Sequence, residues 1–149
     1  MNLKPTLIQD AIALEKLQKF LQANKLPHED VKADGNIFIG YYDEAGNIIG
    51  SGGLELYATS ALLRSLAVSQ NHRGKNLGKK IVDDLLQTAR DLDIQSIFLL
   101  TETAHDFFLR KGFVDISREN VPLPVKSSSE FAFVCPVSAA CMLYSAESK

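Results

Sequence analysis

The chain has 149 residues, of which 46% are hydrophobic and 23% are charged, and its formal net charge at pH 7 is −2. This length suits a single domain of ordinary soluble composition, spanning residues 1–149, and the small negative charge argues against a general nucleic-acid binder. No run of about 20 apolar residues predicts a membrane span. The N-terminus lacks the apolar core of a signal peptide, and the two cysteines make no disulfide framework, so we expect a cytoplasmic protein.

The first part of the chain predicts one helix and several strands. A weak strand over residues 3–7 precedes a helix over 8–24, in which apolar residues recur at helical spacing. A turn at residues 44–47 joins two strand patterns into a hairpin, and a further strand follows. These strands are expected over residues 36–42, 48–57 and 61–68.

The second part adds the clearest helix of the chain, which begins near Leu77. Its apolar stripe consists of Leu77, Ile81, Val82, Leu85, Leu86 and Ala89. A compact apolar run predicts a buried strand, and weaker signals predict a short helix, another strand, a helical turn and a final strand. They fall at residues 96–101, 104–111, 113–116, 126–131 and 140–144. The order predicts an α/β fold with a mixed sheet and helices on both faces.

A basic, glycine-bearing turn between Val68 and Gly78 is the most distinctive stretch of the sequence. Because it lies between a strand and a helix start, several backbone N–H groups and the helix dipole favour an anion there. Its cations are Arg73, Lys75, Lys79 and Lys80. The turn therefore predicts a phosphate cradle, with a basic surface turn that only caps the helix as the alternative. A P-loop fits worse, because Lys80 stands where that motif needs Ser or Thr.

The spacing of this turn resembles the pyrophosphate loop of the GNAT superfamily of N-acetyltransferases, Arg/Gln-x-x-Gly-x-Gly/Ala. Arg73 fills the first position and Gly78 the last, while Asn76 stands at the usual middle glycine. Asn accepts a left-handed conformation more readily than other non-glycine residues, so the turn can be kept.

Further segments resemble the same superfamily in the same order. They are the strand Leu66-Ala67-Val68, the strand Leu99-Leu100-Thr101 and the segment Phe107-Phe108-Leu-Arg-Lys-Gly112-Phe113. The resemblance covers residues 3–145 and implies that strands four and five splay apart to admit acetyl-CoA as cosubstrate. It implies CoA contacts for Leu66, Ala67, Val68, Arg73, Gly74, Lys75, Asn76, Leu77, Gly78, Lys79, Thr101, Phe107 and Phe108.

A narrower resemblance links the chain to small acetyltransferases encoded with arsenic-resistance genes. Among the segments that carry it are Gly53-Leu-Glu55-Leu-Tyr57 and Leu62-Leu-Arg64-Ser-Leu-Ala-Val68. It implies transfer of an acetyl group to the amine of a small acceptor, such as an amino acid or a toxic analogue of one. A homodimer is a further implication of the resemblance.

The residues that would carry proton transfer are less clear. The superfamily often uses a tyrosine as general acid where this chain has Phe108, and a phenyl ring can donate no proton. Glu55 points to the opposite strand face from Leu54 and Leu56, and is our candidate base for the acceptor amine, directly or through water. The alternative is a strand carboxylate paired with Arg64 or a lysine.

Arg64 lies two residues before Leu66, so strand alternation predicts that both share the face beside the acyl site. An arginine on an apolar strand needs an acidic partner. That partner is either internal, Glu55 or Glu102, or an acid on the acceptor that the guanidinium holds bidentately. The second option predicts substrate binding at Arg64 and acceptors that carry a carboxylate, arsonate or phosphinate.

No metal site is predicted, because His28, His72 and His105 lack ligand spacing and two cysteines alone make a weak site. A second function class stays open. Phe108 and Asn76 depart from the superfamily pattern, and both departures fit an acyl-CoA-binding regulatory module with little catalysis.

Overall fold

The computed structural model describes residues 4–128, 131 and 139–145, and within them it forms a mixed sheet of seven strands in the order β1-β2-β3-β4-β5-β7-β6. The strands are β1 (Thr6–Leu7), β2 (Asn36–Tyr42), β3 (Ile48–Tyr57), β4 (Ser60–Val68), β5 (Ser96–Thr101), β6 (Val114–Asp115) and β7 (Ala140–Ser145). The helices are α1 (Ala11–Ala23), α2 (Leu77–Asp91), α3 (His105–Arg110) and α4 (Leu123–Lys126), with 3₁₀ turns at Gln70–His72 and Arg118–Asn120.

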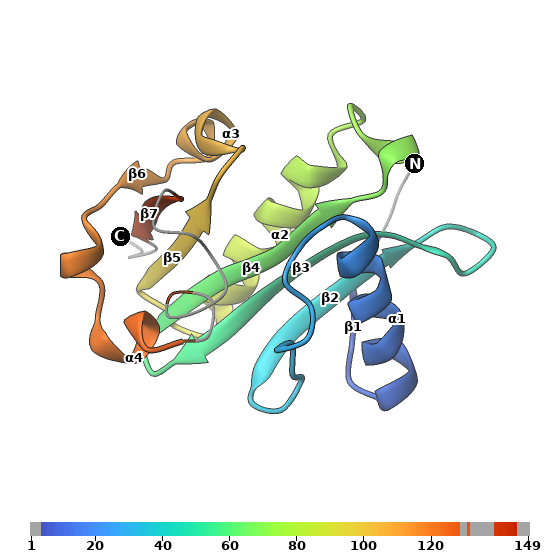
Figure 1. Cartoon of the computed structure of the whole chain (residues 1–149), viewed down its shortest axis with the longest axis horizontal. Coiled ribbons are helices and arrows are strands. Elements are labelled where there is room, and N and C mark those ends of the chain that lie inside the picture. The colour runs from blue at the N-terminus through green and yellow to red at the C-terminus, as the bar shows by residue number, and fades with distance from the viewer. Residues whose placement is uncertain (1–3, 129–130, 132–138, 146–149) are drawn as a thin grey trace.

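Strands β4 and β5 form the parallel pair of this sheet, and they pair over only a short length. The register joins Ser60 to Ser96, Ala61 to Ile97 and Leu62 to Phe98. Beyond these pairs the two strands diverge, as Figure 1 shows. The predicted α/β fold with splayed fourth and fifth strands is therefore confirmed.

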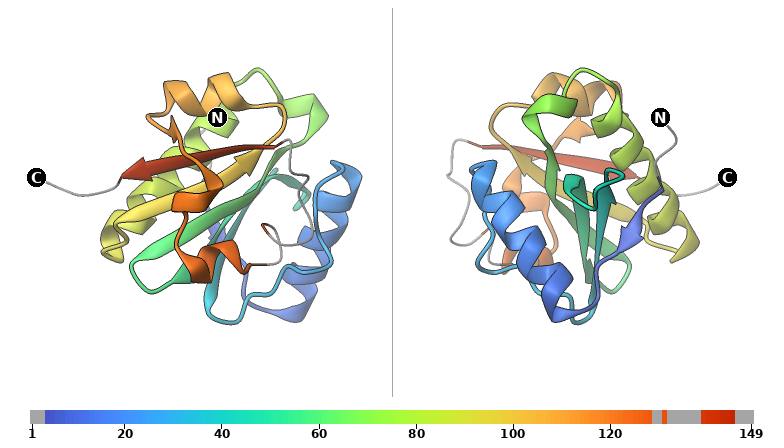
Figure 2. Two further views of the ribbon diagram at one scale, coloured as in Figure 1. Left: turned by 60° about the vertical axis from the view of Figure 1, so that its left-hand side comes forward. Right: turned by 90° about the vertical axis from the view of Figure 1, so that its right-hand side faces the viewer.

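Helices α1 and α2 cover opposite faces of the sheet (Figure 2). The predicted apolar stripe of α2 is buried against β3 and β4, from Leu77 to Ala89. Glycines on β3 allow this close approach, since a Cβ on Gly52 would lie 2.7 Å from Ile81 and 2.8 Å from Leu85. A side chain at Gly52 would push α2 away from the sheet.

Helix α1 begins at Ala11, later than predicted, because Asp10 caps it. The Asp10 carboxylate accepts a hydrogen bond of 2.7 Å from the backbone N–H of Ala13. Ile8 lies outside the helix, where its side chain is buried and its N–H donates to the carbonyl of Phe38. The prediction began the helix too early because Ile8, although outside the helix, is apolar and continues its spacing of apolar residues.

Some predicted boundaries shift near the termini. The first strand is shorter than the predicted strand over residues 3–7, and residue 3 of that prediction lies outside the described residues. The helical turn predicted near 126–131 is seen as α4, which begins at Leu123 directly after Pro122. Residues 129–130 of that prediction also lie outside the described part.

Strand β4 contains a bulge at Ser65. Ser51 of β3 pairs with Ala67 and Gly53 pairs with Arg64, so β4 has one residue more than β3 between these pairs. Ser65 adopts a left-handed φ of 62°, which is uncommon for a residue with a side chain. The buried hydroxyl of Ser51 donates a hydrogen bond of 2.7 Å to the Ser65 carbonyl and supports the bulge.

The bulge changes which side chains share a face of β4. Leu63, Leu66 and Val68 pack with the cluster that contains α2, whereas Ala67 packs with the cluster around α1. Arg64 lies on the α1 side, where it reaches the loop between α1 and β2. The prediction that Arg64 shares a face with Leu66 is therefore wrong, because the extra residue reverses the alternation.

No helix within the described residues is both long and apolar enough to cross a membrane.

Candidate functional site

A cleft lies where β4 and β5 separate. Its volume is about 780 Å³, and its walls come from β4, from the end of β5 and from the loop over residues 24–30 that follows α1. Arg64 and Leu66 of β4, Thr101 of β5 and Phe108 of α3 line it together with Asp30. The splayed strands thus open into a cavity with both polar and apolar walls.

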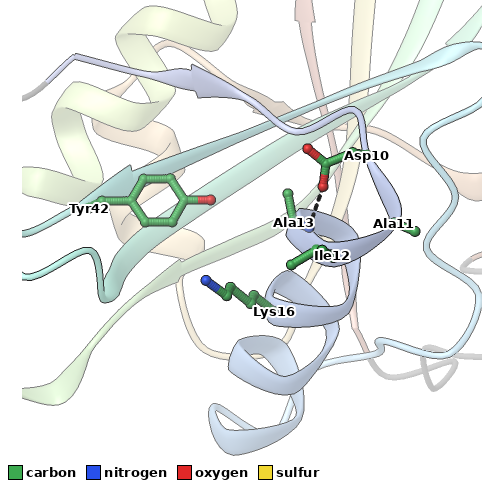
Figure 3. A pocket seen from close by; sticks show the side chains of 6 residues that line it. All are labelled: Asp10, Ala11, Ile12, Ala13, Lys16 and Tyr42. Atoms are coloured by element: carbon green, nitrogen blue, oxygen red, sulfur yellow. Dashed lines mark hydrogen bonds between the residues drawn. The ribbon is translucent and has the colours of Figure 1, made fainter.

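A second concavity of about 510 Å³ lies at the start of α1, and Figure 3 shows its side chains. Asp10, Lys16 and Tyr42 supply its polar groups. Burial, followed by the charge of Asp10, raises the pKa of the Tyr42 phenol, and the Asp10 carboxylate serves as the helix cap. The cleft between β4 and β5 is larger and is lined by the buried Arg64, so it is the candidate site.

Arg64 is the centre of an ion cluster, of which Arg64 and Asp30 line the cleft and Glu55 does not. Its Nη1 lies 2.7 Å from Asp30 Oδ2 and 2.9 Å from Glu55 Oε2, and its Nη2 lies 2.8 Å from Asp30 Oδ1. The Arg64 side chain is 0% exposed, compared with 10% for Glu55 and 21% for Asp30. The internal partner predicted for Arg64 is thus found in Glu55, and the fork of the guanidinium also holds Asp30 bidentately.

Glu55 is held from two sides. Its Oε2 accepts from Arg64, and its Oε1 accepts a hydrogen bond of 2.9 Å from the Tyr57 hydroxyl. Burial, followed by the charge of Glu55, raises the pKa of Tyr57 to about 12, so this phenol stays protonated and donates at neutral pH. The candidate base therefore has a fixed orientation.

Sequence reasoning assigned no role to Asp30 or Tyr57. The requirement for an acid beside Arg64 was correct, but Asp30 comes from an irregular loop 34 residues away in the sequence, which no strand or helix pattern places. The hydrogen bond from Arg64 is the largest of the effects that lower the pKa of Asp30.

This lowered pKa predicts a pH-dependent contribution of Asp30 to stability. The contribution is complete above the carboxyl's unfolded-state pKa of about 3.9 and is lost as the pH falls through the lower folded-state value. We expect the difference in free energy of unfolding between the native protein and Asp30→Asn to shrink from pH 6 to pH 3. Denaturant titrations measure it, with Glu29→Gln as the neighbouring control. A difference that stays constant with pH would contradict this linkage.

The turn before α2 leads directly into the helix start through residues with left-handed backbone conformations. Gly74 and Asn76 adopt left-handed φ values of 80° and 64°, and α2 begins at the next residue, Leu77. The expectation that Asn76 accepts this conformation is confirmed. Lys75 and Lys79 are exposed beside the turn, whereas Lys80 pairs with Asp84 at 3.0 Å.

Arg73 connects this turn to two other elements. Its Nε donates to the Val68 carbonyl at the end of β4, and its Nη2 donates to the Asn24 side chain at the end of α1, both at 3.0 Å. The Asn24 side chain in turn donates to the Phe20 carbonyl. The turn is thus tied to the loop that walls the cleft.

Aromatic residues link the turn to the cleft. Phe108 is 4% exposed and packs edge-on against Phe107, with ring centroids 5.1 Å apart. A Cβ on Gly78 would lie 3.9 Å from the Phe107 ring, so α3 packs beside the start of α2. The Thr101 hydroxyl accepts from the Ala104 N–H and shapes the turn into α3. Phe108 is therefore part of the hydrophobic core.

Over the described residues, no group of three or more His, Cys, Asp or Glu side chains could hold a metal ion.

Comparison with known proteins identifies the family. Residues 8–113, more than half of the chain, match the profile of the Acetyltransferase (GNAT) family. The chain belongs to this family. Membership accounts for the splayed strands and the glycine-bearing turn, and it confirms the resemblance to the GNAT superfamily that the sequence indicated.

Individual GNAT relatives agree with this assignment. An amino-acid acetyltransferase of Mycobacterium tuberculosis is 40% identical over 90 residues, which are 59% of this chain and 49% of the relative. This chain therefore spans about half the length of the curated relatives it matches.

Solved structures show the same fold. Rv2747 of M. tuberculosis, in complex with CoA and NLQ, is 25% identical with a TM-score of 0.74, and the match covers 95% of this chain and 99% of that one. An N-acetylglutamate synthase of Neisseria gonorrhoeae, in complex with CoA and N-acetyl-glutamate, is 14% identical with a TM-score of 0.79, covering 99% and 36%. CoA is thus the ligand of two structural neighbours.

Proposed function

We propose that this protein transfers the acetyl group of acetyl-CoA to the amine of a small acceptor. The observation that carries the proposal is the cleft where β4 and β5 separate, because it lies beside a helix start whose turn favours an anion. The CoA pyrophosphate would bind at residues 73–79, and pantetheine would extend the sheet along residues 66–68, past Thr101 and the two phenylalanines.

The bulge at Ser65 supports a role for β4 in the chemistry. By breaking the regular ladder it redirects the backbone next to the cleft, where the N–H near Leu66 can polarise the thioester carbonyl. Holding the amine and the thioester in line supplies much of the rate enhancement. Because Phe108 carries no acid, the leaving thiolate takes its proton from water, from the protonated nitrogen of the tetrahedral intermediate or from another side chain.

We further propose that Glu55 removes the amine proton through a water molecule. Its side chain is only 10% exposed and both of its oxygens accept hydrogen bonds, which suits a fixed carboxylate reached through a bridging water. The Tyr57 hydroxyl then maintains the orientation of the carboxylate.

The acceptor that we propose is an amine that also carries an acid, held by Arg64. Two observations support it: Arg64 lines the cleft, and a relative at 40% identity is named an amino-acid acetyltransferase. The resemblance to the arsenic-resistance group extends the proposal to arsonate and phosphinate analogues of amino acids.

A screen of thiol release from acetyl-CoA tests this function. The panel contains amino acids, their amides, neutral amines and the arsenic and phosphorus analogues. Release with at least one amine, with the acetyl group found on its nitrogen, supports the enzyme. CoA binding without release across the panel would favour the regulatory module, to which the missing acid at Phe108 gives specific support.

Substitution of Arg64 tests the acceptor class. We expect Arg64→Ala to weaken acidic acceptors by about 2–4 kcal/mol, the scale of a truncated charge pair, and neutral amines much less. Arg64→Lys keeps the charge but loses the planar fork, so it should still raise KM for acidic acceptors. Steady-state kinetics on an acid and its amide give both numbers, and thermal melting shows whether each variant folds. Equal losses for acid and amide would make Arg64 solely a structural partner of Asp30 and Glu55.

The remaining expectations from the sequence are kept as proposals. They are a single domain over residues 1–149, a cytoplasmic location and a homodimer. Light scattering on the purified protein measures its oligomeric state.

A further inference from the structure

Asp30 occupies the part of Arg64 that an acceptor acid would need. Its two oxygens lie 2.7 Å and 2.8 Å from Nη1 and Nη2, which is the fork geometry by which arginine recognises a free carboxylate. Both residues line the cleft. An acid on the acceptor and the carboxylate of Asp30 are therefore alternative ligands of the same two nitrogens.

The two carboxylates around Arg64 differ in how firmly they are held. Glu55 lies on β3, an interior strand of the sheet, and also accepts from Tyr57. Asp30 lies on the loop after α1 and is twice as exposed, at 21% compared with 10%. Its neighbour Val31 is 1% exposed and anchors the loop in the core, so the Asp30 side chain can turn away while the loop stays in place. Asp30 is thus the exchangeable member.

Charge makes the exchange necessary. One guanidinium between two carboxylates leaves a net charge of −1 for these three groups, and a third carboxylate in this buried position would be repelled. We propose that Asp30 competes with the acceptor's acid group for Arg64, so that an acidic acceptor binds by displacing the Asp30 carboxylate. Asp30 is then a specificity-determining residue, and this inference rests on the proposed function.

The competition has a measurable consequence for affinity. An acid can bind only those molecules in which the Asp30 carboxylate has left Arg64, which we call the displaced state. Its apparent dissociation constant equals the intrinsic constant divided by the fraction of molecules in that state. Removing the Asp30 charge should therefore tighten the binding of acids and leave neutral ligands unaffected. A purely structural role for the Asp30–Arg64 pair predicts the opposite sign, because losing the pair would loosen the cleft for every ligand.

The probe pair is N-acetylglycine, the acetylated form of the smallest amino acid, and N-acetylglycinamide, which lacks the acid. Each ligand is titrated in the presence of CoA against the native protein and against Asp30→Asn, and binding is detected by ligand-observed NMR. We expect the dissociation constant of N-acetylglycine to fall by roughly tenfold or more, as for a displaced state populated at about 10% or less, and that of the amide to change little. Asp34→Asn, which alters an exposed acid of the same loop outside the cleft lining, should leave both unchanged.

Two additional variants keep the test decisive. Adding Arg64→Lys to Asp30→Asn should abolish the gain, because the fork that receives the acid is lost. If Asp30→Asn fails to fold, Asp30→Ser replaces it, with thermal melting as the check. Unchanged or weaker binding of N-acetylglycine by the folded variant, including no detectable binding to either protein, overturns the competition. If Asp30→Asn binds N-acetylglycine more tightly but no amine releases thiol from acetyl-CoA, the result contradicts the proposed acetyltransferase activity. The competition between Asp30 and the acid for Arg64 is still supported in that case.

Discussion

Replacing Glu55 by Gln is expected to lower turnover about 10²- to 10⁴-fold, the scale of a lost general base. The amide has nearly the same shape as the carboxylate and still accepts from Tyr57, whose hydroxyl lies 2.9 Å from Oε1 in the native protein. CoA affinity should not change, because Glu55 lies on β3, away from residues 73–79. Single-turnover measurements on the acceptor found by the amine screen give the rate.

Tyr57→Phe is the matched control, since it removes a contact to Glu55 but keeps the carboxylate. We expect a much smaller loss of rate for this variant than for Glu55→Gln. The acidic limb of the pH–rate profile should be altered only when the carboxylate itself is removed. Near-normal turnover of a folded Glu55→Gln protein would show that the carboxylate serves only as a structural partner of Arg64.

Replacing Gly78 by Asp is expected to weaken CoA binding by about 2–4 kcal/mol, because a negative charge would stand where the pyrophosphate needs charge-assisted hydrogen bonds. The fold should tolerate the change. A Cβ at Gly78 would meet Val68 at 3.8 Å and Phe107 at 3.9 Å, which are ordinary contacts. Calorimetric titration with CoA measures the loss.

Gly78→Asn separates charge from bulk, because Asn has almost the size of Asp without its charge. Gly78→Asn should lose less affinity for CoA than Gly78→Asp does. Gly78→Ala should show the smallest loss of the three variants. Lys75→Ala should also have a small effect, since an exposed cation is screened by solvent. Unchanged CoA affinity in a folded Gly78→Asp protein would contradict the proposal that this turn binds the CoA pyrophosphate.

The order of elements followed from the sequence because each element has a strong local pattern. The stripe of α2 and the apolar run of β5 are buried as their spacing predicted. Boundaries were less predictable where one side chain decides them, as Asp10 does by capping α1. The close packing of α2 at Gly52 has no local signal, because it depends on Ile81 and Leu85 of a different element.

The candidate site was predictable only where its residues are close in the sequence. The turn from Arg73 to Gly78 is one continuous motif, and its left-handed Asn76 followed from residue chemistry. The bulge at Ser65 has no signal in the alternation of apolar residues, so the orientation of Arg64 was predicted wrongly. Asp30 was missed because its approach to Arg64 depends on how the loop after α1 folds over the sheet.

The short pairing of β4 with β5 divides the sheet mechanically. Strands β1 to β4 form one continuous antiparallel ladder and β5, β7 and β6 form another, and the backbone seam between them runs only from Ser60 to Leu62. Amides beyond this seam should exchange with solvent more readily than those inside either ladder. A cofactor that lies along the open edges would act as a missing strand, so its arrival should slow exchange on β4 and β5 together and make the two ladders unfold as one cooperative unit.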